Sequence, residues 1–199
     1  SGLVFPFESQ GGGGGVRGVG GTRNCDWWFT NEAILLDTAG RYTTEADDHD
    51  EWMAFLEQLL KYRAEKPLNG VIVTVSINEL LDATDDQIQQ SGKKIRARID
   101  EMQTVLKMIL PVYILFTKAD LVAGFTEFFG DFKKSERGQP WGATFRLEAS
   151  KAEPGKLFDA EFDTLIEALH TRGMKRMVTE RNRETKEKVY QFPLEFAAI

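Results

Sequence analysis

The chain has 199 residues, of which 42% are apolar and 28% are charged, and its formal net charge is −6 at pH 7. These values exclude a disordered or fibrous protein and favour one substantial folded domain. Lysine and arginine are scattered among acidic residues, so we expect no nucleic-acid partner. No apolar run reaches the roughly 18 residues that span a membrane, and the first residues lack signal-peptide features, which predicts a soluble piece.

Glycine dominates residues 10–21, which include five consecutive glycines at 11–15. Such a stretch has few side chains to pack and many backbone conformations to lose on folding. We expect a mobile loop, and the five-glycine run is natural, an engineered linker or a placeholder for an unseen loop. The single cysteine, Cys25, excludes an internal disulfide and fits a reducing compartment, and the two histidines are too far apart to form a recurrent metal-binding pattern.

Strands and helices alternate along the rest of the chain. A period of two, turn residues and a short apolar run predict an antiparallel hairpin over residues 25–37. Apolar residues at helical spacing predict a helix over 49–64, which ends before Pro67. Continuous apolar and β-branched residues predict buried strands at 70–76 and 112–117.

The remaining elements follow from the same spacing rules. Apolar residues four and three apart predict a long helix over 93–110 that Pro111 stops. Residues 121–129 and 158–169 are expected to be helical, 143–147 could form a further strand, and 171–199 read as a charged helical extension.

This order of elements predicts an α/β fold with a mostly parallel sheet flanked by helices and a C-terminal helical extension. We expect an α/β domain over residues 1–170 and the start of the extension at 171–199. Ligands of open α/β sheets bind beyond the carboxyl ends of the strands, so polar residues that directly follow strands are candidates for a site.

The first such candidate is the tetrapeptide from Asp37 to Gly40, after the second strand of the hairpin. An Asp at this position can hold Mg²⁺ through water, and a glycine N–H can approach a γ-phosphate. The alternative is an ordinary strand end that Asp caps and Gly turns.

The second candidate is Thr117, Lys118 and Asp120, after the predicted strand at 112–117. An Asp carboxylate can accept two hydrogen bonds from the N1 and N2 groups of guanine, and a Lys stem can lie along the base. The alternative is that Asp120 is the N-cap of the next helix.

The order and placement of these two motifs resemble the third and fourth signature motifs of Ras-like GTPases. Two weaker features fit the same resemblance: Thr22 lies where such proteins place a mobile threonine that closes over Mg²⁺, and Ser150 and Lys151 resemble the loop that contacts the base. The resemblance implies that Thr22 and Asp37 could bind Mg²⁺.

A phosphate-binding loop of the form G-x-x-x-x-G-K-[ST] is missing from the sequence. Either the domain is degenerate, or the chain begins after that loop. Arg41 also stands where Ras-like enzymes that position water with glutamine carry that glutamine. We therefore assign no catalytic base, and we expect these 199 residues alone to bind no nucleotide tightly.

The string from Gly18 to Thr44 is similar to the TssM/IcmF family over nearly its whole length. Four further stretches carry the same resemblance, so that it covers essentially the entire chain: 67–76, 116–121, 137–145 and 190–196. In this family a Walker-type loop precedes the segment that looks like residues 1–6. Loss of the first strand of such a sheet exposes sheet edges, so we expect something else to cover them.

The resemblance implies a cytoplasmic NTPase-like domain of an inner-membrane subunit of type VI secretion, attached to the membrane through segments outside this chain. It implies GTP or ATP with Mg²⁺ as cofactors of the full-length protein, and a TssL-like inner-membrane subunit and baseplate proteins as partners. Two functions remain open at this point: a docking module that nucleotide binding switches, and an active NTPase that energises secretion. A free-standing signalling GTPase does not fit the long family string.

Overall fold

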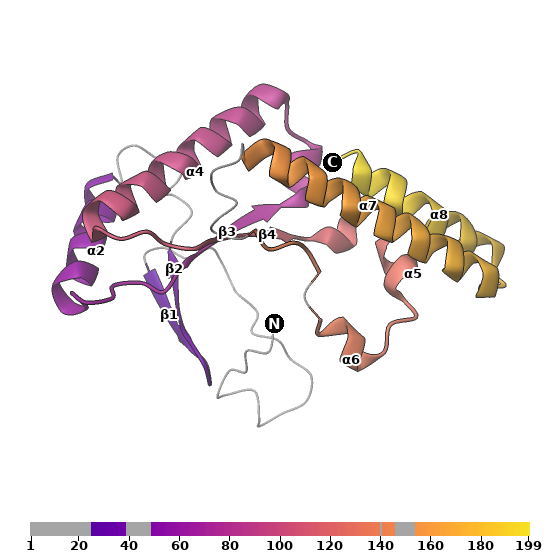
Figure 1. Ribbon diagram of the computed structural model, residues 1–199, viewed down its shortest axis with the longest axis horizontal. Coiled ribbons are helices and arrows are strands. Elements are labelled where there is room, and N and C mark those ends of the chain that lie inside the picture. Colours follow the sequence, from indigo (N-terminus) through magenta and orange to yellow (C-terminus); the bar gives the residue numbers. More distant parts are fainter. Residues whose placement is uncertain (1–24, 39–48, 140, 146–153) are drawn as a thin grey trace. The chain divides into compact units, whose positions relative to one another are not determined.

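The structure, a computed structural model, describes residues 25–38, 49–139, 141–145 and 154–199 (Figure 1). Strands and helices are mixed along the chain, which is compatible with the α/β class. The described strands form two sheets of two strands each, so the mostly parallel, Ras-like sheet stays a prediction. The elements are β1 (Cys25–Phe29), β2 (Ile34–Thr38), α2 (His49–Tyr62), β3 (Val71–Ser76), α3 (Ile77–Leu81), α4 (Asp85–Leu106), β4 (Val112–Thr117), the 3-10 helix η2 (Ala119–Leu121), α5 (Phe125–Phe129), α6 (Lys134–Arg137), α7 (Pro154–Thr179) and α8 (Arg183–Ala197).

The chain divides into two compact units, and each is described by itself. The N-terminal unit consists of Gly2–Val73 and Thr84–Leu115, and the C-terminal unit contains Thr74–Ala83 and Phe116–Ile199. Among the described residues, no helix is long and apolar enough to cross a membrane.

The predicted hairpin is confirmed: β1 and β2 pair antiparallel, with Cys25 opposite Thr38 and Phe29 opposite Ile34. The Thr30 side chain closes the turn, because its Oγ1 donates to the carbonyl of Ala33 at 2.8 Å and accepts from the Ala33 N–H at 2.9 Å. The local bonding of a Thr side chain thus fixes the register that the alternating pattern only suggests.

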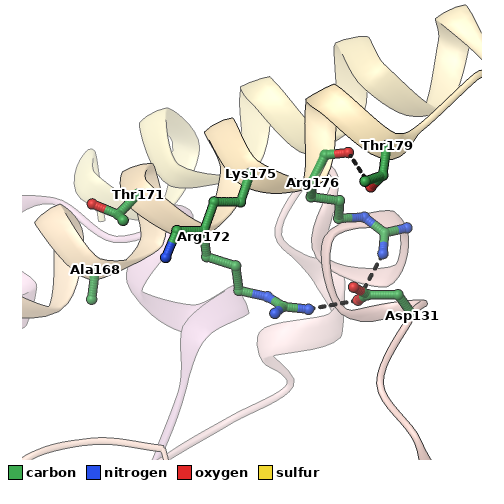
Figure 2. A pocket seen from close by; sticks show the side chains of 7 residues that line it. All are labelled: Asp131, Ala168, Thr171, Arg172, Lys175, Arg176 and Thr179. Carbon is green, nitrogen blue, oxygen red and sulfur yellow. Dashed lines mark hydrogen bonds and ion pairs between the residues drawn. The ribbon is translucent and has the colours of Figure 1, made fainter.

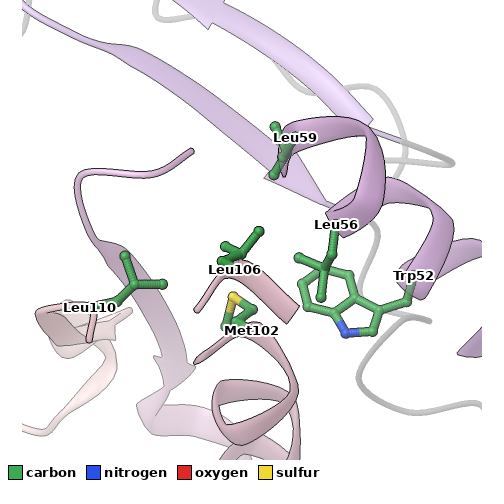
Figure 3. Close-up of a cluster of buried hydrophobic side chains, with 6 residues drawn as sticks. All are labelled: Trp52, Leu56, Leu59, Met102, Leu106 and Leu110. Carbon is green, nitrogen blue, oxygen red and sulfur yellow. The ribbon is translucent and has the colours of Figure 1, made fainter. Parts of the chain in front are cut away.

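The core of the N-terminal unit lies between α2 and the C-terminal part of α4 (Figure 3). Three side chains of α2 at helical spacing are buried against residues of α4 and the segment after it: Trp52, Leu56 and Leu59 with Met102, Leu106 and Leu110. The predicted helix at 49–64 is confirmed, since α2 presents this apolar face to the core.

A charged network at the edge of this core also joins the two helices. The indole Nε1 of Trp52 donates to Glu101 at 3.0 Å, and Arg98 donates to both carboxylate oxygens of Glu101 at 2.8 and 2.7 Å. Arg98 also donates to Nδ1 of His49 at 2.9 Å. The carboxylate of Glu101 is therefore satisfied although it is only partly exposed.

Helix α4 begins earlier and ends earlier than the sequence predicts. It begins after Thr84, whose Oγ1 accepts from the Gln87 N–H while the Gln87 side chain accepts from the Thr84 N–H, and this capping box fixes the N-terminus. It ends at Leu106, and its C-cap, Lys107, has φ 54° and ψ 37°. The prediction that Pro111 stops the helix is wrong, because the left-handed cap comes first and leaves Ile109 outside the helix and 82% exposed.

The C-terminal unit is built around an aromatic cluster between α5 and α8, with α7 packed on both. Phe128 and Phe192 are fully buried, with ring centroids 4.8 Å apart. At Gly173, α7 packs directly on this cluster, since a Cβ there would make ordinary van der Waals contact with the Phe128 ring at 3.4 Å. The predicted helix at 158–169 is confirmed as part of α7, which continues without a break past residue 170, and the division into domains at that point stays a prediction.

Two predictions in this region need correction. The segment at 121–129 is not one helix, because Gly124, with φ 81°, separates η2 from α5. The strand expected at 143–147 is absent at residues 143–145, which have no regular structure, and residues 146–147 lie outside the described part of the chain. The helical structure expected over 171–199 is confirmed by the end of α7 and by α8, and Pro193 lies inside α8.

Of the two strands expected to be buried, β4 is largely open to solvent, whereas β3 is mostly partly buried, with Ile72 and Thr74 exposed and Ser76 buried. All five residues from Val112 to Phe116 in β4 are exposed, with Tyr113 at 58%, Ile114 at 61% and Leu115 at 52%. Successive side chains of a strand point to opposite faces, so both faces of β4 are open. The apolar pattern of β4 is that of a strand that other segments cover. Our expectation that something else covers exposed sheet edges stays a prediction.

Two glycine substitutions test the packing of α5 on α8. Gly124→Ala should reduce the free energy of unfolding by more than about 2 kcal/mol, because φ is 81° and the new Cβ would collide with the Lys188 carbonyl. Gly92→Ala, in α4 with nothing near the new Cβ, should raise it by about 0.5–1 kcal/mol. Denaturant unfolding measures both changes. A Gly124→Ala variant with the same free energy of unfolding as the unchanged protein would contradict the close approach of Gly124 to the Lys188 carbonyl.

Candidate functional site

The loop after β4 carries the predicted residues Thr117, Lys118 and Asp120. Thr117 ends the strand, and its Oγ1 donates to the Val75 carbonyl at 3.4 Å. Lys118 turns the chain into η2, and Ala119 at its start and Val122 at its C-cap pack against the core. Ala119 is partly buried and Val122 is buried, whereas Lys118 and Asp120 are exposed.

Asp120 is not a helix N-cap, and that alternative is therefore wrong. It lies inside η2, whose N-cap is Lys118, and the N-cap of α5 is Gly124. Among the described residues, the Asp120 carboxylate has no hydrogen-bond or ion-pair partner. It is exposed at the carboxyl end of a strand, where it can accept hydrogen bonds from a ligand.

Lys118 adopts a backbone conformation that few residues other than glycine adopt. Its φ is 60° and its ψ is 30°, and its side chain makes no capping bond. A left-handed conformation costs an L-residue about 1–2 kcal/mol. Strain of this kind often accompanies functional loops, so it agrees with a role for this loop but does not by itself identify one.

Ser76 is a residue that the sequence analysis missed. It ends β3 beside the end of β4, is buried, and its hydroxyl has no hydrogen-bond partner among the described residues. A polar residue directly after the apolar run of β3 is the same signal that led to Thr117. Its hydroxyl adds an unused hydrogen-bonding group to this end of the strand pair.

Asp37 lies near the end of β2 and is exposed, as a metal or phosphate ligand needs to be. The register of the hairpin places Asp26 directly opposite it, which the sequence analysis did not predict. Burial raises the pKa of the neighbouring Cys25 thiol, and the charges of Asp26 and Asp37 raise that pKa further. Cys25 is therefore a neutral thiol at pH 7.

The other predicted residues lie outside the described part of the chain: Thr22, Gly40, Arg41, Ser150 and Lys151. Asp37 belongs to the N-terminal unit and the Thr117–Asp120 loop to the C-terminal unit, so the two motifs are described separately. The described residues contain no group of three or more His, Cys, Asp or Glu side chains that could hold a metal ion. The assignment of Mg²⁺ to Thr22 and Asp37 stays a prediction.

Comparison with known proteins identifies the family of this chain. Residues 45–199 match the model of the IcmF-related N-terminal domain. The chain therefore belongs to the IcmF-related family, as its resemblance to TssM/IcmF proteins predicted.

A curated relative extends this similarity over the whole chain. It is TssM1, a type VI secretion system component of Pseudomonas aeruginosa, which is 46% identical over 206 residues. The match covers 100% of this chain and 19% of that protein, so the chain spans about a fifth of the relative's length. No solved structure matches the chain.

The left-handed conformation of Lys118 can be tested against that of Lys107, the C-cap of α4. Glycine removes the steric cost in both, so Lys118→Gly and Lys107→Gly should each raise the free energy of unfolding by about 0.5–1 kcal/mol. Denaturant unfolding measures the change. A loss of stability in Lys118→Gly alone would contradict the backbone conformation described for the loop.

The hairpin register can be tested through the reactivity of Cys25. Asp37→Asn should lower the pKa of Cys25, because it removes a negative charge that the register places across the hairpin from the thiol. The rate of Cys25 alkylation by iodoacetamide should therefore begin to rise at a lower pH than in the unchanged protein. Asp163→Asn, on α7, is the matched control and should leave the profile unmoved; equal profiles for all three proteins would argue against the register.

Proposed function

We propose that this domain is part of a membrane-complex subunit of a type VI secretion system. The observation that carries the proposal is the 46% identity to TssM1, which extends over the whole chain. The domain would lie at the cytoplasmic face of the bacterial inner membrane. Parts of the protein outside these residues would attach it to the membrane and contact a TssL-like partner. Its task would be to anchor the complex and dock the baseplate and tail.

The open strand β4 supports a docking role. Five consecutive apolar side chains from Val112 to Phe116 are exposed, and a surface of this kind commonly marks a contact with another segment or protein. The same strand leads directly into the Lys118–Asp120 loop. A ligand at the loop would therefore act next to the surface that makes the contact.

We further propose that GTP or ATP binding switches this docking. The support is the exposed Asp120 carboxylate, which has no partner among the described residues and lies beyond a strand end. Asp120 would accept from the guanine N1 and N2 groups, the Lys118 stem would lie along the base, and Asp37 would hold Mg²⁺ through water. The phosphates would be held by a loop outside these residues.

The alternative is an active NTPase that energises secretion. Its only support from this chain is the similarity of the two strand-end motifs to those of Ras-like enzymes. No residue in the chain is assigned as the group that positions the attacking water, so the switch is favoured over the enzyme. Phosphate release by a protein that carries an intact phosphate-binding loop would reverse this preference.

Calorimetric titration with GTP and ATP of the longer protein that contains this domain tests the base preference. Asp120→Ala should weaken GTP binding about 10- to 100-fold, because it removes a charged hydrogen-bond acceptor, and should leave ATP binding unchanged. Asp86→Ala, at an exposed position of α4, is the control. Equal affinity of the unchanged protein for both nucleotides would contradict guanine preference.

Recruitment of baseplate proteins in a pull-down, compared among the unchanged protein, Asp37→Ala and Asp120→Ala, separates the switch from docking. If both variants recruit normally, the nucleotide switch is wrong and plain docking remains. If the unchanged protein recruits no baseplate protein, the docking role itself is wrong.

A further inference from the structure

A positively charged groove lies within the C-terminal unit, away from the strand-end loops in the sequence. It has a volume of about 540 Å³, and α7 lines one side from Ala168 to Thr179 while Asp131 lines the other (Figure 2). The positions along α7 recur three and four residues apart and so form one face of the helix.

Two arginines in this groove converge on a single carboxylate oxygen. Nη2 of Arg172 lies 2.6 Å and Nη1 of Arg176 lies 2.7 Å from the same Oδ1 of Asp131 (Figure 2). A guanidinium carries five N–H donors, so one shared oxygen uses a small part of the available donors. The Nε atoms of both arginines are buried and have no hydrogen-bond partner among the described residues, so a ligand in the groove would be bound through the Nη groups.

The two guanidinium groups are held in place before any ligand arrives. The Cζ atom of Arg172 lies 4.2 Å from the centroid of the Phe132 ring and 5.7 Å from that of Phe128. The Arg176 side chain is only 12% exposed. Fixed side chains lose little conformational entropy on binding, which favours recognition of an anion.

The groove also carries more positive than negative charge. Lys175 lies on the same face of α7 and has no ion-pair partner in the described part of the chain. The three cations are opposed by Asp131 and by Glu180, which is 3.8 Å from Arg176. One positive charge therefore remains uncompensated at this place in a chain whose formal net charge is −6.

We propose that this groove binds an acidic segment of a partner protein. Asp131 already shows that a carboxylate fits between the two arginines, and guanidinium groups match the geometry of carboxylates. From Ala168 to Thr179 the groove follows α7 for about 16 Å, at 1.5 Å per residue. This length matches about five residues of an extended peptide, whereas a single phosphate would contact only part of it. The site gives the proposed docking function a specific contact, and in that sense it depends on that function.

The test is a titration of the isotope-labelled chain, followed by nuclear magnetic resonance, with a hexaglutamate peptide. A hexaglutamine peptide, inorganic phosphate, and vesicles of phosphatidylcholine with and without phosphatidylglycerol serve as comparison ligands. With hexaglutamate only, saturable changes in amide chemical shift are expected at Asp131 and along α7 from Ala168 to Thr179. Lys175→Glu should weaken this binding about fivefold, because it reverses an exposed charge without removing a contact.

Lys94→Glu, the same charge change on α4, is the matched control and should leave the affinity unchanged. The proposal is overturned by shifts that do not saturate, by equal weakening in the two variants, or by tighter binding of phosphate or of phosphatidylglycerol vesicles. The readout requires neither nucleotide nor baseplate proteins. A loss of groove binding therefore leaves the recruitment experiment intact, and a failure of recruitment leaves the groove measurement intact.

Discussion

The close packing of α5 on α8 determines where the candidate sites of the C-terminal unit lie. Gly124 permits it, because any larger residue there would meet the carbonyl of Lys188. Phe128 and Phe192 fill the contact, and the Lys188 ammonium donates to Glu127 at 2.8 Å, which lowers the pKa of Glu127 below its ordinary value. A tight backbone contact, an aromatic core and an ion pair thus hold the two helices together.

The two candidate sites of the unit are built outward from this core. Val122 packs into it and fixes η2, so Asp120 two residues earlier points to solvent. On another side, Phe128 and its neighbour Phe132 lie beneath the guanidinium of Arg172. The loop and the groove therefore share one support, although they recognise different chemical groups.

The sequence predicted those elements whose signals are local and periodic. The hairpin and α2 have clear periods of two and 3.6, and the structure confirms both. The end of α4 was missed because Lys107 takes a left-handed conformation that is usual for glycine, and no simple sequence rule assigns it to lysine. Asp26 opposite Asp37, and Arg172 with Arg176 on Asp131, depend on register and on contacts far apart in the chain, which single-sequence patterns do not contain.

The apolar pattern of β4 predicts a burial that the described residues of this chain do not provide. Its run from Val112 to Phe116 predicts burial on both faces, yet each of these side chains is exposed. Full burial of an aliphatic or aromatic side chain of this size contributes about 1.5–3 kcal/mol. Cover of several of them would therefore contribute several kcal/mol, enough to hold a further segment or a partner on the strand.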